Sequence, residues 1–150
     1  MYKINEYVIY DDGIGQIDHI EENKVFLLTY PENQKIEIDL SQVVRKICSK
    51  EVIEEVVERI AYTCTLQIIN EKFRKEVYQD AMKQFDELEW IKVIKSEYIR
   101  HKASKAKDFE KMYAKQAKHY LYCEISILLG IDYNDVEQYI VDKIHEEQWD

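Results

Sequence analysis

Residues 6–21 constrain the fold of this chain most strongly, because strand-like patterns flank a cluster of glycines. On one side Val8 and Tyr10 lie two residues apart, and on the other side apolar and polar residues mix at strand-like spacing over residues 14–20. Residues 11–15, between the two sides, hold two of the chain's three glycines. This predicts a tight reversal that needs a positive φ or a close backbone approach, as in a β-hairpin with a bulge.

Further strands are predicted after this hairpin. Residues 24–30 are mostly apolar, which is typical of a buried strand, and a turn is expected at residues 31–34. Residues 35–40 alternate between charged and aliphatic side chains, which predicts a strand covered on one face. Four or five short strands within fifty residues indicate a small SH3-like or Tudor-like β-barrel.

After Ser49 the apolar spacing becomes helical, and about five helices are expected. The first covers residues 52–60 and the third residues 88–98, and a loop at residues 102–107 should precede a helix over residues 108–129. Ser104 or Asp108 is the expected cap of that helix, and a last helix should begin near residues 132–134. The second pattern is carried by Ile69, Phe73, Val77, Ala81 and Phe85.

The expected fold class is therefore α+β, with a small barrel over residues 1–48 and an all-α bundle over residues 49–150. No basic segment followed by an apolar run opens the chain, and no apolar stretch approaches the roughly 20 residues that cross a bilayer. We therefore expect a cytoplasmic protein with no membrane partner. We also expect it to be a monomer.

No residue pattern points to catalysis or to a cofactor. The four histidines are scattered, and the chain has no glycine-rich phosphate loop. Cys48, Cys64 and Cys123 are widely spaced, which argues against a disulfide framework and a zinc site, and we expect them to be reduced and mostly buried. His119 and Cys123 are four residues apart but are too few to hold a metal ion. We expect a protein that is not an enzyme and binds no cofactor or metal.

The distribution of charge leaves two interpretations open. The net charge of −9 argues against nucleic acid as a partner, yet residues 91–118 hold nine basic residues against three acidic ones. These cations either coat a solvated helix surface or grip a phosphate backbone without reading the base sequence. In the second interpretation the candidate DNA-binding residues are Lys92, Lys95, Arg100, Lys102, Lys105 and Lys107.

Two motifs stand in order and together span nearly the whole chain. The first approximates F-x-x-G-D-x-V-V-Y-P-x-H-G-V-G-x-I-x-x-I-E and stands here as Tyr2, Asn5-Glu6, Val8-Ile9-Tyr10, Gly13-Ile14-Gly15, Ile17 and Ile20-Glu21. The second approximates E-K-M-x-x-x-A-x-x-x-L-x-x-E-L and stands here as Glu110-Lys111-Met112, Ala117, Leu121 and Glu124-Ile125. With these motifs the chain resembles the CarD-like (CdnL-like) bacterial transcription regulators. Val44-Arg45 also occupies the place where the family has a valine and an arginine after the barrel.

The resemblance implies a Tudor-like domain that docks on the β subunit of RNA polymerase. It also implies a helical domain that contacts promoter DNA and stabilises the open complex. The chain departs from the family pattern at Asn5-Glu6, Asp11 and Asp12, which make its first hairpin more acidic. The family's tryptophan near the start of the second helix, which wedges at the edge of the DNA bubble, has no counterpart in residues 69–73.

Our leading hypothesis is a non-enzymatic transcription regulator that binds polymerase through its barrel and promoter DNA weakly and non-specifically through its helices. The alternative is a protein-interaction module that binds polymerase or another protein without touching DNA. In either case the partner should add along an exposed strand edge, at residues 24–30 or 35–40. The candidate polymerase-binding residues are Lys24, Glu32, Lys35, Glu37 and Asp39.

Overall fold

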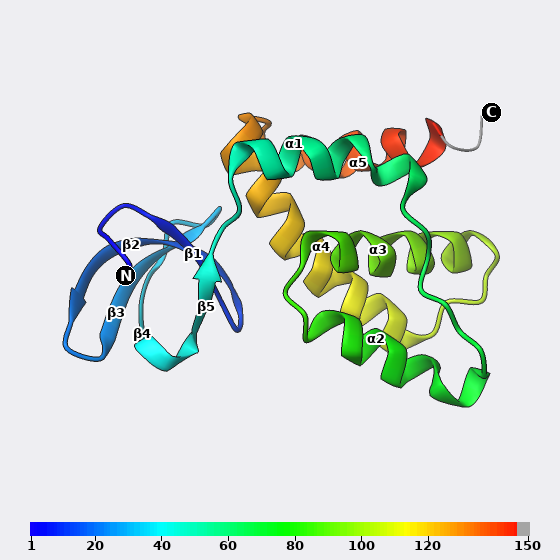
Figure 1. The fold of residues 1–150 in the computed structure, drawn as a ribbon, viewed down its shortest axis with the longest axis horizontal. Coiled ribbons are helices and arrows are strands. Elements are labelled where there is room, and N and C mark those ends of the chain that lie inside the picture. The colour runs from blue at the N-terminus through cyan, green and yellow to red at the C-terminus, as the bar shows by residue number, and fades with distance from the viewer. Residues whose placement is uncertain (147–150) are drawn as a thin grey trace. The chain divides into compact units, whose positions relative to one another are not determined.

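The computed structural model describes residues 1–146, and the chain forms two compact units, Met1–Ser49 and Lys50–Asp150 (Figure 1). Within the described residues, the first unit holds a five-stranded antiparallel sheet and the second holds five α-helices. The predicted α+β class is confirmed. No helix in this part of the chain combines the length and the apolar character needed to span a bilayer.

The sheet of the first unit has the strand order β4-β3-β2-β1-β5. Its strands are β1 (Tyr7–Tyr10), β2 (Gly13–Glu21), β3 (Lys24–Tyr30), β4 (Lys35–Asp39) and β5 (Val43–Lys46). The first four strands pair with their sequence neighbours, whereas β5 returns to pair with β1. The predicted strand over residues 24–30 is confirmed, but the prediction that it forms an exposed edge is wrong, because β2 and β4 flank it. The edges of the sheet are β4 and β5.

Gly15 allows two strands to approach closely. A Cβ atom at Gly15 would lie 3.1 Å from the carbonyl oxygen of Leu28 and 3.2 Å from the Cβ atom of Leu27. Neither glycine of the predicted turn has a positive φ, since Gly130 is the glycine with that conformation in the described chain. The close approach is therefore confirmed. The register shifts of this region lie in the β2–β3 pair and in the β1–β5 pair.

One face of the sheet carries the core of the first unit. Alternation places aliphatic side chains of successive strands on that face, and Ile38 contributes from β4 while the charged residues of β4 stay exposed. The one-sided burial predicted for residues 35–40 is confirmed over the strand itself. The buried residues of this core are Val8, Tyr10, Ile17, Val25, Leu27 and Ile38.

The second unit is built from α1 (Lys50–Glu58), α2 (Arg74–Met82), α3 (Glu87–Lys102), α4 (Asp108–Leu129) and α5 (Tyr133–Glu146). The helix predicted over residues 108–129 is confirmed as α4, and Gly130 ends it with a φ of 70°. Asp86 begins α3, since its side chain accepts a hydrogen bond from the backbone N–H of Glu89. Trp90 is fully buried in the unit and stacks on Tyr120.

Two details of the helical prediction are wrong. The second apolar pattern does not form one buried stripe, because Ile69 lies outside any helix and α2 begins only at Arg74, after the 3-10 helix η3 (Glu71–Phe73). The side chains that α2 buries are Arg74, Tyr78, Ala81 and Met82. The cap of α4 is Lys107, because Glu110 turns back to accept a hydrogen bond from its backbone N–H at 2.8 Å.

The three cysteines form no disulfide within the described residues, but they differ in burial. Cys123 on α4 is buried, Cys48 is partly buried and Cys64 is exposed. The expectation that they are mostly buried is therefore wrong. Cys64 is exposed and lies in the irregular segment between α1 and α2, where apolar residues do not recur at helical or strand spacing.

Candidate interaction surfaces

The first candidate surface is the outer edge of β4, and two backbone hydrogen bonds define its orientation. At one end of the β3–β4 pair the N–H of Leu40 donates to the carbonyl of Asn23 at 2.7 Å. At the other end the N–H of Thr29 donates to the carbonyl of Gln34 at 2.8 Å. Because bonded and non-bonded pairs alternate along antiparallel strands, the even-numbered residues of β4 face β3. The backbone groups of the odd-numbered residues therefore point away from the sheet.

These outward residues are Lys35, Glu37 and Asp39. The N–H of Asp39 donates to the side-chain Oε1 of Gln42 at 2.8 Å, so the segment that follows β4 covers this end of the edge. Within the described residues, the backbone groups of Lys35 and Glu37 remain available to a further strand. This is the arrangement that β-strand addition requires.

Opposite charges surround this open edge. The ammonium group of Lys24 lies 2.6 Å from the carboxylate of Asp39 and 4.0 Å from that of Glu37. The hydrogen bond to Asp39 raises the pKa of Lys24 above its ordinary value. Glu32 is exposed in the turn that joins β3 to β4. The structure thus brings all five predicted polymerase-binding residues onto one hairpin.

Lys95 must be removed from the predicted DNA-binding set. Its side chain is only 2% exposed, and its ammonium group donates to the carbonyls of Ile60, Ala61 and Thr63 at 2.9, 3.4 and 2.6 Å. These bonds connect α3 to the segment that follows α1. A buried ammonium group held by three carbonyls cannot reach a phosphate, so the prediction for Lys95 is wrong.

Two further candidates are partly engaged within the protein. Lys92 lies 2.7 Å from the carboxylate of Glu89, and this hydrogen bond raises the pKa of Lys92. Arg100 donates through Nε to the carboxylate of Glu110 at 2.7 Å and through Nη2 to the carbonyl of Lys105 at 3.1 Å. Arg100 therefore shapes the α3–α4 connection as well as contributing charge there.

The remaining candidates, Lys102, Lys105 and Lys107, are exposed around the connection between α3 and α4. The ammonium group of Lys102 lies 5.3 Å from the centre of the Tyr98 ring, a favourable cation–π distance. The backbone of Lys107 caps α4, but its side chain faces solvent. These three lysines are the part of the predicted set that can meet a phosphate backbone.

Glu110 fixes the shape of this connection. Its side chain is fully buried and accepts hydrogen bonds from the hydroxyl of Tyr78 at 2.8 Å and from Arg100 at 2.7 Å. Burial opposes ionisation of Glu110, but these bonds and the one from the backbone N–H of Lys107 outweigh it and lower its pKa. Arg74 adds a second guanidinium group 3.8 Å away. No local pattern of residues indicates this centre, since its members come from three different helices.

The same centre brings an apolar segment to the lysine-bearing end of the unit. Arg74 pairs with Glu71 as well as with Glu110, so η3 and the start of α2 lie beside the α3–α4 connection (Figure 1). The hydrogen bond from Arg74 lowers the pKa of Glu71 to about 2. Ile69, just before η3, is 102% exposed, and Phe73 is 44% exposed. Exposed apolar and cationic side chains therefore gather at one end of the helical unit.

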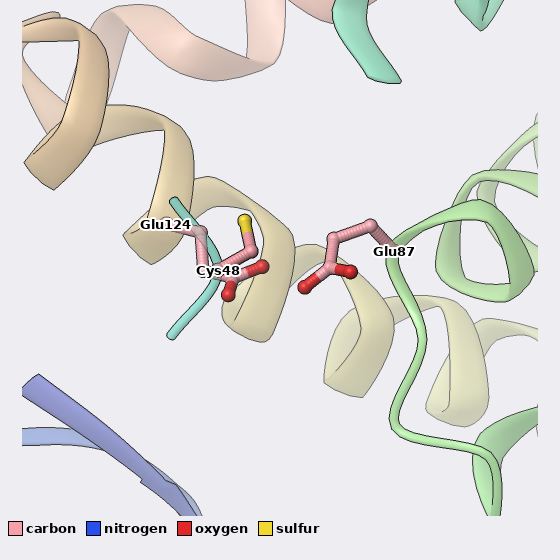
Figure 2. Close-up of side chains that lie close together, drawn as sticks. All are labelled: Cys48, Glu87 and Glu124. Carbon is pink, nitrogen blue, oxygen red and sulfur yellow. The ribbon is translucent and has the colours of Figure 1, made fainter. Parts of the chain in front are cut away.

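Two buried carboxylates lie elsewhere in this unit. Glu87 reaches from the start of α3 toward Glu124 on α4, and their nearest oxygen atoms lie within 4.8 Å of one another (Figure 2). Cys48, also labelled in Figure 2, belongs to the first unit. Two carboxylates alone are too few ligands for a metal centre.

Comparison of the sequence with models of protein families and with curated proteins finds no match.

Proposed function

We propose that this chain is a cytoplasmic bacterial transcription regulator of the CarD-like kind. In this proposal a Tudor-like N-terminal domain binds the β subunit of RNA polymerase, and the helical unit contacts promoter DNA weakly and modulates the stability of the open complex. The observation that carries the proposal is the open edge of β4, at which the backbone groups of Lys35 and Glu37 face outward. The two sequence motifs and the order of sheet and helices support it.

The β4 edge can be tested by removing one backbone donor. Replacing Glu37 with proline removes an outward N–H, while the φ of a strand remains compatible with proline at an edge position. We expect this variant to lose at least about tenfold in affinity for the isolated polymerase β subunit, which corresponds to about 1.4 kcal/mol. Surface plasmon resonance with immobilised β subunit measures this affinity.

Glu37→Gln is the matched control, because it removes the side-chain charge and keeps the backbone donor. Unchanged binding by Glu37→Gln together with weak binding by Glu37→Pro identifies pairing through the backbone. Unchanged binding by the proline variant would exclude β4 as the docking edge. Circular dichroism verifies that each variant keeps its sheet.

The DNA half of the proposal depends on the end of the helical unit described above. Lys102, Lys105 and Lys107 can neutralise phosphates there, and the neighbouring Ile69 offers an exposed apolar side chain of the kind that wedges between base steps. Ile69 lies in the segment where the family resemblance implies a wedge residue. Because the chain carries a net charge of −9, contact with DNA should depend on polymerase to hold the unit near the duplex.

Replacing Lys102, Lys105 and Lys107 with glutamate should shorten the half-life of the open complex, because three attractive phosphate contacts become repulsive. We expect at least a fivefold loss of the regulator's effect, corresponding to about 1 kcal/mol. Competitor-challenge assays on a promoter measure this half-life, and repetition over a range of salt concentrations shows how many phosphate contacts are lost. Binding to the polymerase β subunit should not change.

A charge-matched control replaces Lys3, Lys50 and Lys83, which are exposed on other parts of the surface. If that control lowers the half-life equally, the effect reflects net charge and the DNA surface is wrongly placed. Ile69→Ala tests the apolar part in the same assay, and it should shorten the half-life without changing the salt dependence.

The alternative is a protein-interaction module that occupies polymerase or another protein without touching DNA. The burial of Lys95 and the internal bonds of Lys92 and Arg100 favour it, since they remove or engage three of the six predicted DNA-binding cations. Under this alternative the β4 variants lose function, whereas the lysine variants do not.

A further inference from the structure

A hollow of about 620 Å³ lies between α3, α4 and α5, apart from the two surfaces described above. Its lining includes the nearly buried side chains of Ile94, Ile140 and Ile144, and Tyr122 lines its α4 side. This volume falls within the range of about 300–1,000 Å³ typical of small-molecule sites. The hollow therefore offers an apolar base large enough for a small ligand.

Three lysines of α4 line the same hollow. Lys111, Lys115 and Lys118 follow one another at helical spacing, so one face of α4 directs them to the same side. Lys118 lies 3.4 Å from the carboxylate of Glu137 on α5, so its charge is partly balanced. Among the described side chains, no hydrogen bond or ion pair engages the ammonium groups of Lys111 and Lys115.

The hollow is also lined by an acidic and a basic side chain of α3, which face each other. Glu97 on α3 faces His101, with the carboxylate 4.0 Å from Nδ1. Lys111 and Lys115 are one helical turn apart, about 6 Å along the axis, so they can bind a single anionic group together. The lining thus combines an apolar base with two ammonium groups that have no anion of their own in the described structure.

From this combination we infer that the hollow between α3, α4 and α5 binds a small organic anion. Its phosphate, sulfonate or carboxylate group meets Lys111 and Lys115, and its aromatic or aliphatic body covers Val141 and the isoleucines. A duplex is too wide to enter a hollow of about 620 Å³, whereas a small ligand fits inside it. Lys111 and Lys115 line this half-open hollow, so they can meet the anionic group of a ligand whose body lies inside it.

Two fluorescent probes separate the anionic contact from the apolar one. 1-Anilinonaphthalene-8-sulfonate and N-phenyl-1-naphthylamine share the same aromatic body, and only the first carries a sulfonate. The double variant Lys111→Glu/Lys115→Glu should bind the sulfonate probe at least about tenfold more weakly, while its affinity for the neutral probe changes less than about twofold. Val141→Trp, which fills the hollow, should weaken binding of both probes.

The full chain is titrated with each probe by fluorescence, and amide chemical shifts map the bound position. The control Lys50→Glu/Lys83→Glu carries the same change in charge outside the hollow. One-to-one binding that the control retains, with shifts confined to α3, α4 and α5, supports the inference. Absence of binding, equal losses in the double variant and the control, or shifts confined to other elements would overturn it. Because Lys111 and Lys115 are exposed, their replacement should leave the helices folded, and circular dichroism verifies this.

Discussion

Replacing Glu110 with alanine should lower the free energy of unfolding by about 3–5 kcal/mol, the largest effect expected of any single substitution proposed for this chain. The substitution leaves Arg74 and Arg100 near a vacated buried site, and it removes the acceptor of the Tyr78 hydroxyl. It also removes the acceptor at the start of α4. Urea denaturation followed by circular dichroism measures the loss.

Glu137→Ala is the matched control, because Glu137 is an exposed helical glutamate whose ion pair with Lys118 should contribute less than about 1 kcal/mol. Equal losses in the two variants would show that the Glu110 centre contributes little to stability. A Glu110→Gln variant separates charge from shape, since the amide keeps an acceptor oxygen but cannot carry the negative charge.

The Glu110 centre also predicts how stability depends on pH. The folded state lowers the pKa of Glu110, so the unfolded state binds its proton first as the solution is acidified. The stabilisation is complete above the unfolded-state pKa of about 4.3 and is lost as the pH falls through the lower folded-state value. The difference in stability between the parent protein and Glu110→Gln should therefore shrink below about pH 4.

Replacing Lys95 with methionine should cost about 2–3 kcal/mol, because the carbonyls of Ile60, Ala61 and Thr63 lose a shared donor inside the protein. Methionine fills a similar volume, so the cost arises mainly from the unsatisfied acceptors. Lys92→Met is the control on the same helix, where the side chain is partly exposed and pairs with Glu89. Thermal unfolding that is identical for the two variants would contradict the structural role of Lys95.

Several helices and strands could be predicted from the local pattern of apolar residues, turns and glycines. Residues 24–30 could be placed because they form a short, mostly apolar run before a turn, and residues 108–129 because they carry a long helical period that ends at a glycine. The second helix was misplaced because Ile69 and Phe73 have the spacing of a buried stripe, whereas Asn70 starts a 3-10 turn that directs them outward. Apolar spacing alone does not distinguish a buried face from an exposed one.

The candidate site residues were harder to predict from the sequence than the helices and strands, because tertiary structure decides which of them are exposed. Lys92 and Lys95 are the same residue type on the same helix, yet Lys95 lies four residues after the buried Ile91, on the apolar face of α3. That spacing is the local sign of its burial. Of the two predicted edges, residues 24–30 and residues 35–40, the strand order leaves only the second open. The alternation of apolar and polar residues within one strand does not show which strands lie beside it. The pairing of Glu110 with Arg74 and Arg100 joins residues from three helices, so no local pattern announces it.

The return of β5 to β1 has a consequence for synthesis of the chain on the ribosome. As the chain emerges, β2, β3 and β4 can each pair with the strand that precedes them, but β1 lacks its second neighbour until Val43–Lys46 has been made. During this interval Val8 and Ile9 stand on an unpaired apolar edge, which favours association with other nascent chains. Translation pausing before β5 would therefore prolong the exposure of this edge, and a chaperone that covers it would limit such association.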